Sequence, residues 1–135
     1  MQKTILLALL LACGTAQASE WVSLGKNGQG AEALVDVSSI RIAGNIRRVW
    51  TKVIFTTHTH KGVNEYANKW VNYELGHDAF DCGNETQRNE ALNIYFEDKT
   101  NYTVPLAPAA TNWDPVPPDS LLSAEMRLVC TWNPK

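Results

Sequence analysis

The sequence predicts an α+β fold in which several antiparallel strands are followed by one late helix. Short segments rich in β-branched and aromatic residues, separated by turn residues, extend from residue 21 to residue 106. An apolar stripe with helical spacing then begins near Ser120. The chain has 135 residues and a mass of 15.0 kDa, and we detect neither internal repeats nor an interdomain linker, so we expect one domain.

The first strands are delimited by turn residues. Three extended segments are predicted before residue 44, at 21–24, 33–37 and 40–43. Glycines end the first segment within 25–30, and Asp36 with Ser38 and Ser39 predicts a turn that ends the second. Gly44-Asn45 predicts a hairpin, because both residues tolerate positive φ.

Ile46–Thr57 is the clearest strand signal, and alternation divides its side chains between two faces. The expected core face holds Val49, Thr51, Val53 and Phe55. The opposite face holds Arg48, Trp50, Lys52 and Ile54. Because both faces carry apolar residues, we expect a central strand.

Later elements are less regular in sequence. We expect loops at 58–64 and 83–89, strands at 66–73, 91–97 and 102–106, and no assignment for 74–82. Five prolines within 105–118 disfavour regular structure there. The helix begins after a cap at Asp119 or Ser120. Its apolar stripe is expected to comprise Leu121, Leu122, Met126 and Val129, with Leu128 at the edge.

The N-terminus has the three parts of a secretory signal peptide. Lys3 supplies the positive charge, residues 5–12 form an apolar run too short to span a bilayer, and Ala16-Gln17-Ala18 is a cleavage site. We therefore expect residues 1–18 to be removed and 19–135 to form the exported domain. The alternative is lipidation at Cys13, because residues 10–13 resemble a lipobox.

Cleavage would leave two cysteines, Cys82 and Cys130. Cysteines of an exported domain usually pair, so we predict a disulfide between them. Metal ligation and redox chemistry are the alternatives; two isolated cysteines make a poor zinc site, and the pair does not form a Cys-x-x-Cys motif.

An ordered set of short motifs carries a family resemblance. Its parts are Trp21, Asp36-x-x-Ser39-Ile40, Gly44, Val49-Trp50, Asp81-Cys82 and Trp113-x-Pro115-Val116-x-Pro118-x-Ser120 before Cys130. In this order they resemble the surface-adhesin protein E-like domain of proteobacterial exported proteins, over the whole mature chain. The resemblance implies a single antiparallel sheet of about six strands with one C-terminal helix packed on it, and often a homodimer. It also implies an outer-membrane adhesin that binds host matrix and plasma proteins.

The residues do not predict a reaction. A net charge of −2 and a pI near 5.9 argue against nucleic-acid binding. No nucleophile–base set or cofactor motif is visible, so we expect a non-enzymatic protein without cofactor or metal. His58-Thr59-His60, with His77 or Asp78, could ligate a metal, but we interpret it as a solvated loop. Asp78 and Asp81 are interpreted as hydrated surface carboxylates.

Charge is distributed unevenly along the chain. Residues 37–64 hold five Lys or Arg and no Asp or Glu, whereas residues 65–98 are strongly acidic. Because Arg48, Trp50 and Lys52 share a strand face, we take them as a candidate interface. Its partner would be a host extracellular or plasma protein, an envelope component, or a second copy. The alternative function is a periplasmic structural or accessory protein without an external ligand.

We predict that the mature protein begins at Ser19, because Ala16-Gln17-Ala18 is a better processing site than the sequence around Cys13. Mass spectrometry of the protein purified from its native host measures this directly. A diacylated Cys13 at the N-terminus would contradict the prediction.

Overall fold

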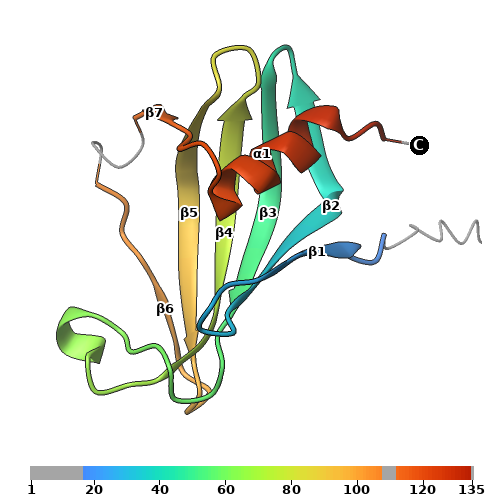
Figure 1. The fold of residues 1–135 in the computed structure, drawn as a ribbon. Helices are drawn as coiled ribbons and strands as arrows, with labels where there is room; N and C mark the ends of the chain where they lie inside the picture. Colours follow the sequence, from blue (N-terminus) through green and yellow to red (C-terminus); the bar gives the residue numbers. More distant parts are fainter. Residues whose placement is uncertain (1–16, 108–111, 135) are drawn as a thin grey trace, which may run out of the picture.

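The computed structural model describes residues 17–107 and 112–134; the signal segment, including Lys3 and Cys13, lies outside them. An antiparallel sheet forms the body of the molecule, with strand order β1-β2-β3-β4-β5-β6 and β7 paired to β5 (Figure 1). The strands are β1 Trp21–Lys26, β2 Glu32–Ala43, β3 Ile46–Ile54, β4 Val71–Asp81, β5 Thr86–Phe96, β6 Asn101–Thr103 and β7 Asp114–Pro115. One α-helix, α1 Leu121–Thr131, packs on this sheet, which confirms the predicted fold class. Within the described ranges, no helix is long and apolar enough to cross a membrane.

The predicted turn at Ser38 and Ser39 is wrong, because β2 continues through it with a shift of register between Asp36 and Arg41. Asp36 Oδ1 accepts a hydrogen bond from Ser38 N at 3.1 Å, and Ser39 Oγ accepts one from Trp50 N at 2.9 Å. The polar side chains therefore form a bulge instead of ending the strand. The Gly44 hairpin is confirmed, with φ of 60°.

Strands β4 and β5 are longer than the sequence indicated. The predicted strand at 66–73 is wrong over its first half: Tyr66 ends the 3-10 helix η1 Asn64–Tyr66, and β4 starts at Val71. The predicted loop at 83–89 is correct only to residue 85, because β5 starts at Thr86. Asp81 Oδ1 accepts hydrogen bonds from the backbone of Gly83 and Asn84, which shortens the turn. Two further bounds differ, since β3 ends at residue 54 and β6 at residue 103.

The proline-rich segment also contributes a strand. The short β7 pairs with Gln87 and Thr86 at the start of β5, contrary to the expectation of no regular structure. Pro115 is compatible with this position because β7 lies at an edge of the sheet, where one strand face needs no backbone donor.

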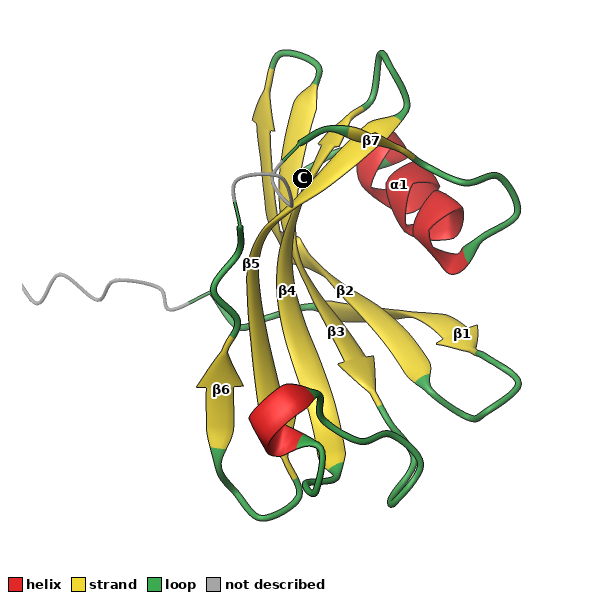
Figure 2. Ribbon diagram, turned by 90° about the vertical axis from the view of Figure 1, so that its left-hand side faces the viewer, coloured by secondary structure: helices red, strands yellow, loops and turns green. Residues whose placement is uncertain are grey.

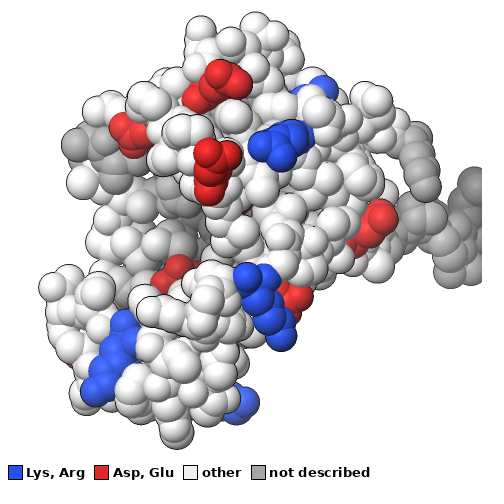
Figure 3. All heavy atoms as spheres, viewed as in Figure 1, with Lys and Arg blue, Asp and Glu red and all other residues white. Residues whose placement is uncertain are grey.

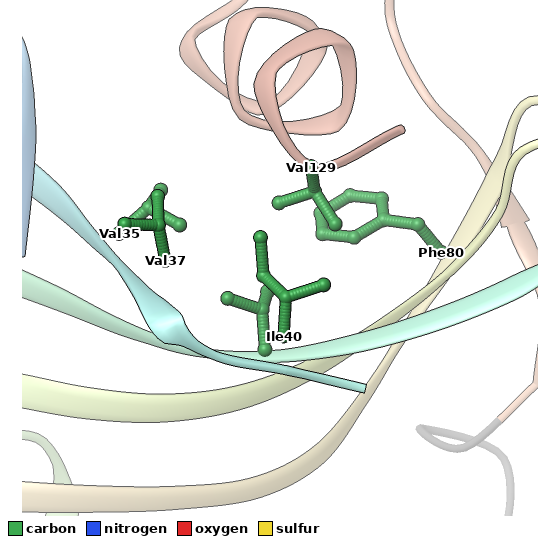
Figure 4. Packing of buried hydrophobic residues seen from close by; sticks show 6 residues of the cluster. Val35, Val37, Ile40, Phe80 and Val129 are labelled. Atoms are coloured by element: carbon green, nitrogen blue, oxygen red, sulfur yellow. The ribbon is translucent and has the colours of Figure 1, made fainter. Parts of the chain in front are cut away.

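Two hydrophobic clusters lie on one face of the sheet. The cluster beneath α1 comprises Val35, Val37, Ile40, Val49, Phe80 and Val129. Figure 4 shows Val129 reaching from the helix toward Phe80 and Ile40. The second cluster contains Val71, Ile94 and Phe96, and Tyr66 from η1 stacks on Phe96. The helix and the 55–70 segment thus cover two halves of the same face.

The predicted core face of β3 and the predicted apolar stripe of the helix are correct only in part. Val49 is fully buried in the cluster beneath α1, but Phe55 packs in the second cluster. Leu121 is 41% exposed and does not belong to the stripe, whereas Leu122, Met126 and Leu128 pack against the core. The predicted stripe is therefore confirmed except for its first member, and it begins at Leu122.

Both ends of α1 are fixed. Ser120 is the cap, with Ser123 completing a capping box. At the other end, Arg47 Nη1 donates hydrogen bonds to the carbonyl oxygens of Val129 and Trp132. The predicted Cys82–Cys130 disulfide is present, joining the turn after β4 to the helix.

Replacing both cysteines, as Cys82→Ser with Cys130→Ser, is expected to lower the free energy of unfolding by about 2–5 kcal/mol. The bond closes a 48-residue separation, and its loss enlarges the unfolded ensemble. Urea denaturation of both proteins measures the difference. Two titratable thiols in natively purified parent protein would show that the bond does not form.

Candidate binding face

The face of the sheet opposite α1 carries the predicted interface residues. Figure 2 shows α1 standing on one side of the sheet, and no α-helix of the described chain lies on the other. Along β3, Val49 and Thr51 are buried, while Trp50 is 37% exposed between Arg48 and Lys52. Strand alternation thus places Arg48, Trp50 and Lys52 on the side that α1 does not cover, which we call the bare face.

Aromatic rings from three other strands accompany Lys52 on the bare face. Lys52 Nζ lies 4.7 Å from the ring centroid of Trp21 on β1 and 5.1 Å from that of Tyr73 on β4. Tyr73 stacks on Tyr95 of β5 with centroids 4.4 Å apart. Among the described residues, no carboxylate lies within ion-pair distance of Lys52. The ammonium group is therefore held by ring faces and is available to pair with a further partner.

Arg48 is held differently, because β5 places Glu90 beside it. Arg48 Nε is 3.0 Å from Glu90 Oε2, and Arg88 Nη2 is 2.7 Å from Glu90 Oε1. Burial opposes ionisation of Glu90, but the hydrogen bonds from Arg88 and Arg48 outweigh it and lower its pKa. The cationic segment of the sequence therefore does not form a uniformly positive patch. On the α1 side, too, basic and acidic side chains are interspersed (Figure 3).

On β3, Trp50 lies between Lys52, which is held by aromatic rings, and Arg48, which is paired with Glu90. Its ring lies 4.8 Å from that of His77, the residue opposite it on β4, and His77 Nδ1 lies 3.4 Å from Glu90 Oε2. Arg88 also covers Trp113 at 4.8 Å from the ring centroid. The bare face thus presents half-exposed aromatic rings interleaved with cations, a composition typical of protein interfaces.

The alternative metal site is not assembled. His58 Nε2 pairs with Glu97 at 3.0 Å, and His60 stacks on Phe55. His77 lies on the bare face and Asp78 on the α1 side. In the part of the chain that the structure describes, no group of three or more His, Cys, Asp or Glu residues could hold a metal ion.

Several residues of interest were missed or misread in the sequence. Asp78 is 8% exposed and hydrogen-bonded, so its interpretation as a hydrated carboxylate is wrong; Asp81 serves the turn instead. Tyr73 and Tyr95 are placed opposite each other by strand register, and Glu90 lies at the irregularity in β5 between Asn89 and Ala91; no local sequence pattern predicts either. Glu125 could have been noticed as a carboxylate within the apolar stripe of the helix.

Replacing the shared carboxylate, as Glu90→Gln, is expected to lower the free energy of unfolding by about 0.5–1 kcal/mol, because the ion pairs that it removes are partly exposed. Urea unfolding at neutral pH provides the measurement. A loss above about 3 kcal/mol would mean that the pairs are buried, and that the bare face is covered.

Comparison with known proteins agrees with the resemblance carried by the motifs. Residues 21–131 match the family described as surface-adhesin protein E. The matched range includes every described strand and the whole of α1. No curated protein and no solved structure matches the chain. The match covers most of the sequence, and the chain belongs to the surface-adhesin protein E family.

Proposed function

We propose that the protein is an exported, non-enzymatic binding protein of the bacterial cell envelope whose bare face docks a host or envelope protein. The observation that carries the proposal is the exposed Trp50 beside the unpaired charge of Lys52, on a sheet face that α1 leaves open. Family membership supports an adhesin-like role. Export rests on the signal-peptide pattern of residues 1–18.

The chemistry of the bare face indicates the kind of partner. Tryptophan and arginine are enriched among the residues that dominate binding energy at protein interfaces. Lys52 is pre-positioned by Trp21 and Tyr73, so a partner carboxylate could pair with it at little conformational cost. Glu90 already neutralises much of the charge of Arg48 and Arg88. We therefore propose a protein partner that presents an apolar side chain to Trp50 and an acidic one to Lys52.

The double variant Trp50→Ala/Lys52→Glu is expected to weaken binding at least tenfold, because it removes the aromatic anchor and places like charges opposite each other. The probes are a pooled plasma-protein fraction and a basement-membrane extract, each immobilised for surface plasmon resonance. Circular dichroism checks that the variant folds.

The matched control is Lys61→Glu/Val63→Ala. It makes the same charge change, also removes a cation lying over a tryptophan, and truncates an exposed apolar side chain in the 55–70 segment. Equal binding by the parent and both variants would contradict the proposal. Sedimentation gives a second contradicting outcome, in which the parent is a dimer and only Trp50→Ala/Lys52→Glu dissociates it. A second copy of the chain would then occupy the bare face. An unfolded Trp50→Ala/Lys52→Glu protein would show that Trp50 belongs to the core.

A further inference from the structure

Glu125 lies on the side of α1 that faces the sheet. It follows Leu122 by three residues and precedes Val129 by four, and both of these pack against the core. Its Oε1 is buried, and no donor among the described residues reaches it. A carboxylate in the middle of an apolar stripe needs a compensating group, because burying an unpaired charge is costly.

A second carboxyl group lies beneath the helix, on β4. Asp78 Oδ2 accepts a hydrogen bond from Thr51 Oγ1 at 2.8 Å, and Asp78 Oδ1 accepts one from Asn89 Nδ2 at 2.7 Å. The remaining amide oxygen of Asn89 is buried and, like Glu125 Oε1, has no donor within the described chain. Gly76 leaves room for this cluster, since a Cβ there would lie 2.8 Å from Thr51 Oγ1.

In the described residues, no Lys or Arg side chain of the strands packed against α1 forms an ion pair with Glu125. Helix α1 contacts β1, β2, β3 and β4, and crosses over the last three in Figure 1. On β3, the guanidinium of Arg47 is engaged by the carbonyls of Val129 and Trp132. The charged residues of the other elements are Lys26 on β1, Glu32, Asp36 and Arg41 on β2, Glu74, Asp78 and Asp81 on β4, and Arg127 on α1 itself. Of all these, none forms an ion pair with Glu125 in the described residues.

Protonation of Glu125 would both remove its negative charge and provide a hydrogen-bond donor. The neutral acid removes one of two negative charges that interact with each other, and its hydroxyl is a donor on a side chain whose Oε1 is buried without one. Burial, and then the charge of Asp78, raise the pKa of Glu125 to about 8. Burial also raises the pKa of Asp78, against the hydrogen bonds from Asn89 and Thr51.

We propose that Glu125 is a proton-dependent latch between α1 and the sheet. While neutral it closes the helix over Asp78, Asn89 and Thr51; once ionised, it loosens the first turns of the helix. The Cys82–Cys130 disulfide and the Arg47 hydrogen bonds hold the last turn in either state.

The sign of the pH dependence follows from the direction of the shift. Because the folded protein binds this proton more tightly than the unfolded chain does, the latch contributes fully below the unfolded pKa of about 4.5. Its contribution is lost as the pH rises to about 8. Across that interval the equilibrium constant for unfolding rises by up to about tenfold per pH unit.

The test compares the disulfide-bonded parent with Glu125→Gln in urea at pH values from 5 to 9. The amide is isosteric, retains a donor and cannot ionise. We expect the ratio of the parent's unfolding constant to that of the variant to rise up to about tenfold per pH unit to pH 8, and then to level off. Hydrogen exchange in the first turns of α1, corrected for intrinsic rates, should accelerate above pH 8 in the parent only.

The control is Glu20→Gln, which neutralises an exposed carboxylate and should follow the parent at every pH. A constant ratio between the parent and Glu125→Gln would overturn the proposal. So would stabilisation of the parent by millimolar Ca²⁺ that Glu125→Gln abolishes, since a cation would then take the proton's place. If Glu125→Gln does not fold, carbon-13 NMR of the parent decides: a Glu125 carboxyl midpoint near 8 supports the latch, and one near 4.5 overturns it.

Discussion

The burial of one sheet face beneath α1 is the constraint on which the other features depend. An 11-residue helix is too short to be stable in water by itself, so it needs the apolar surface that Val49 and Phe80 provide to Val129. Its ends are fixed by the Ser120 cap and by the Cys82–Cys130 bond. The helix and the 55–70 segment cover the same side of the sheet. The other side carries charged, aromatic and aliphatic side chains, among them Arg48, Trp50 and Ile54.

Because side chains alternate along a strand, adjacent residues point to opposite faces of the sheet, and the two faces differ in chemistry. Trp50 and His77 point to the bare face, while their neighbours Thr51 and Asp78 point beneath the helix. The two sides are electrostatically connected, because Glu90 on the bare face contributes to the raised pKa of Asp78. The proposed binding surface and the proposed titratable helix contact therefore involve the same two central strands, β3 and β4.

Features fixed by local chemistry could be predicted from the sequence. The parity of β3, the Gly44 hairpin, the helix cap and the single cysteine pair all depend on residues close in sequence or on simple counting. Features that depend on pairing could not. The sheet overrode turn propensity at Ser38 and extended β5 to Thr86, and only the register shows that Glu90 meets Arg48. The burial of Asp78 likewise follows from a helix contributed by a distant segment.

The accessibility of individual tryptophans tests most directly whether one face is open. In protein labelled with 5-fluorotryptophan, a soluble gadolinium chelate broadens the fluorine resonance of each exposed ring, and single Trp→Phe variants assign the resonances. Trp50 is more than a third exposed, whereas Trp132 packs against the core beneath α1. We expect the resonance of Trp50 to broaden at a much lower chelate concentration than that of Trp132. Equal protection of the two rings would contradict it, because the face opposite the helix would then be covered.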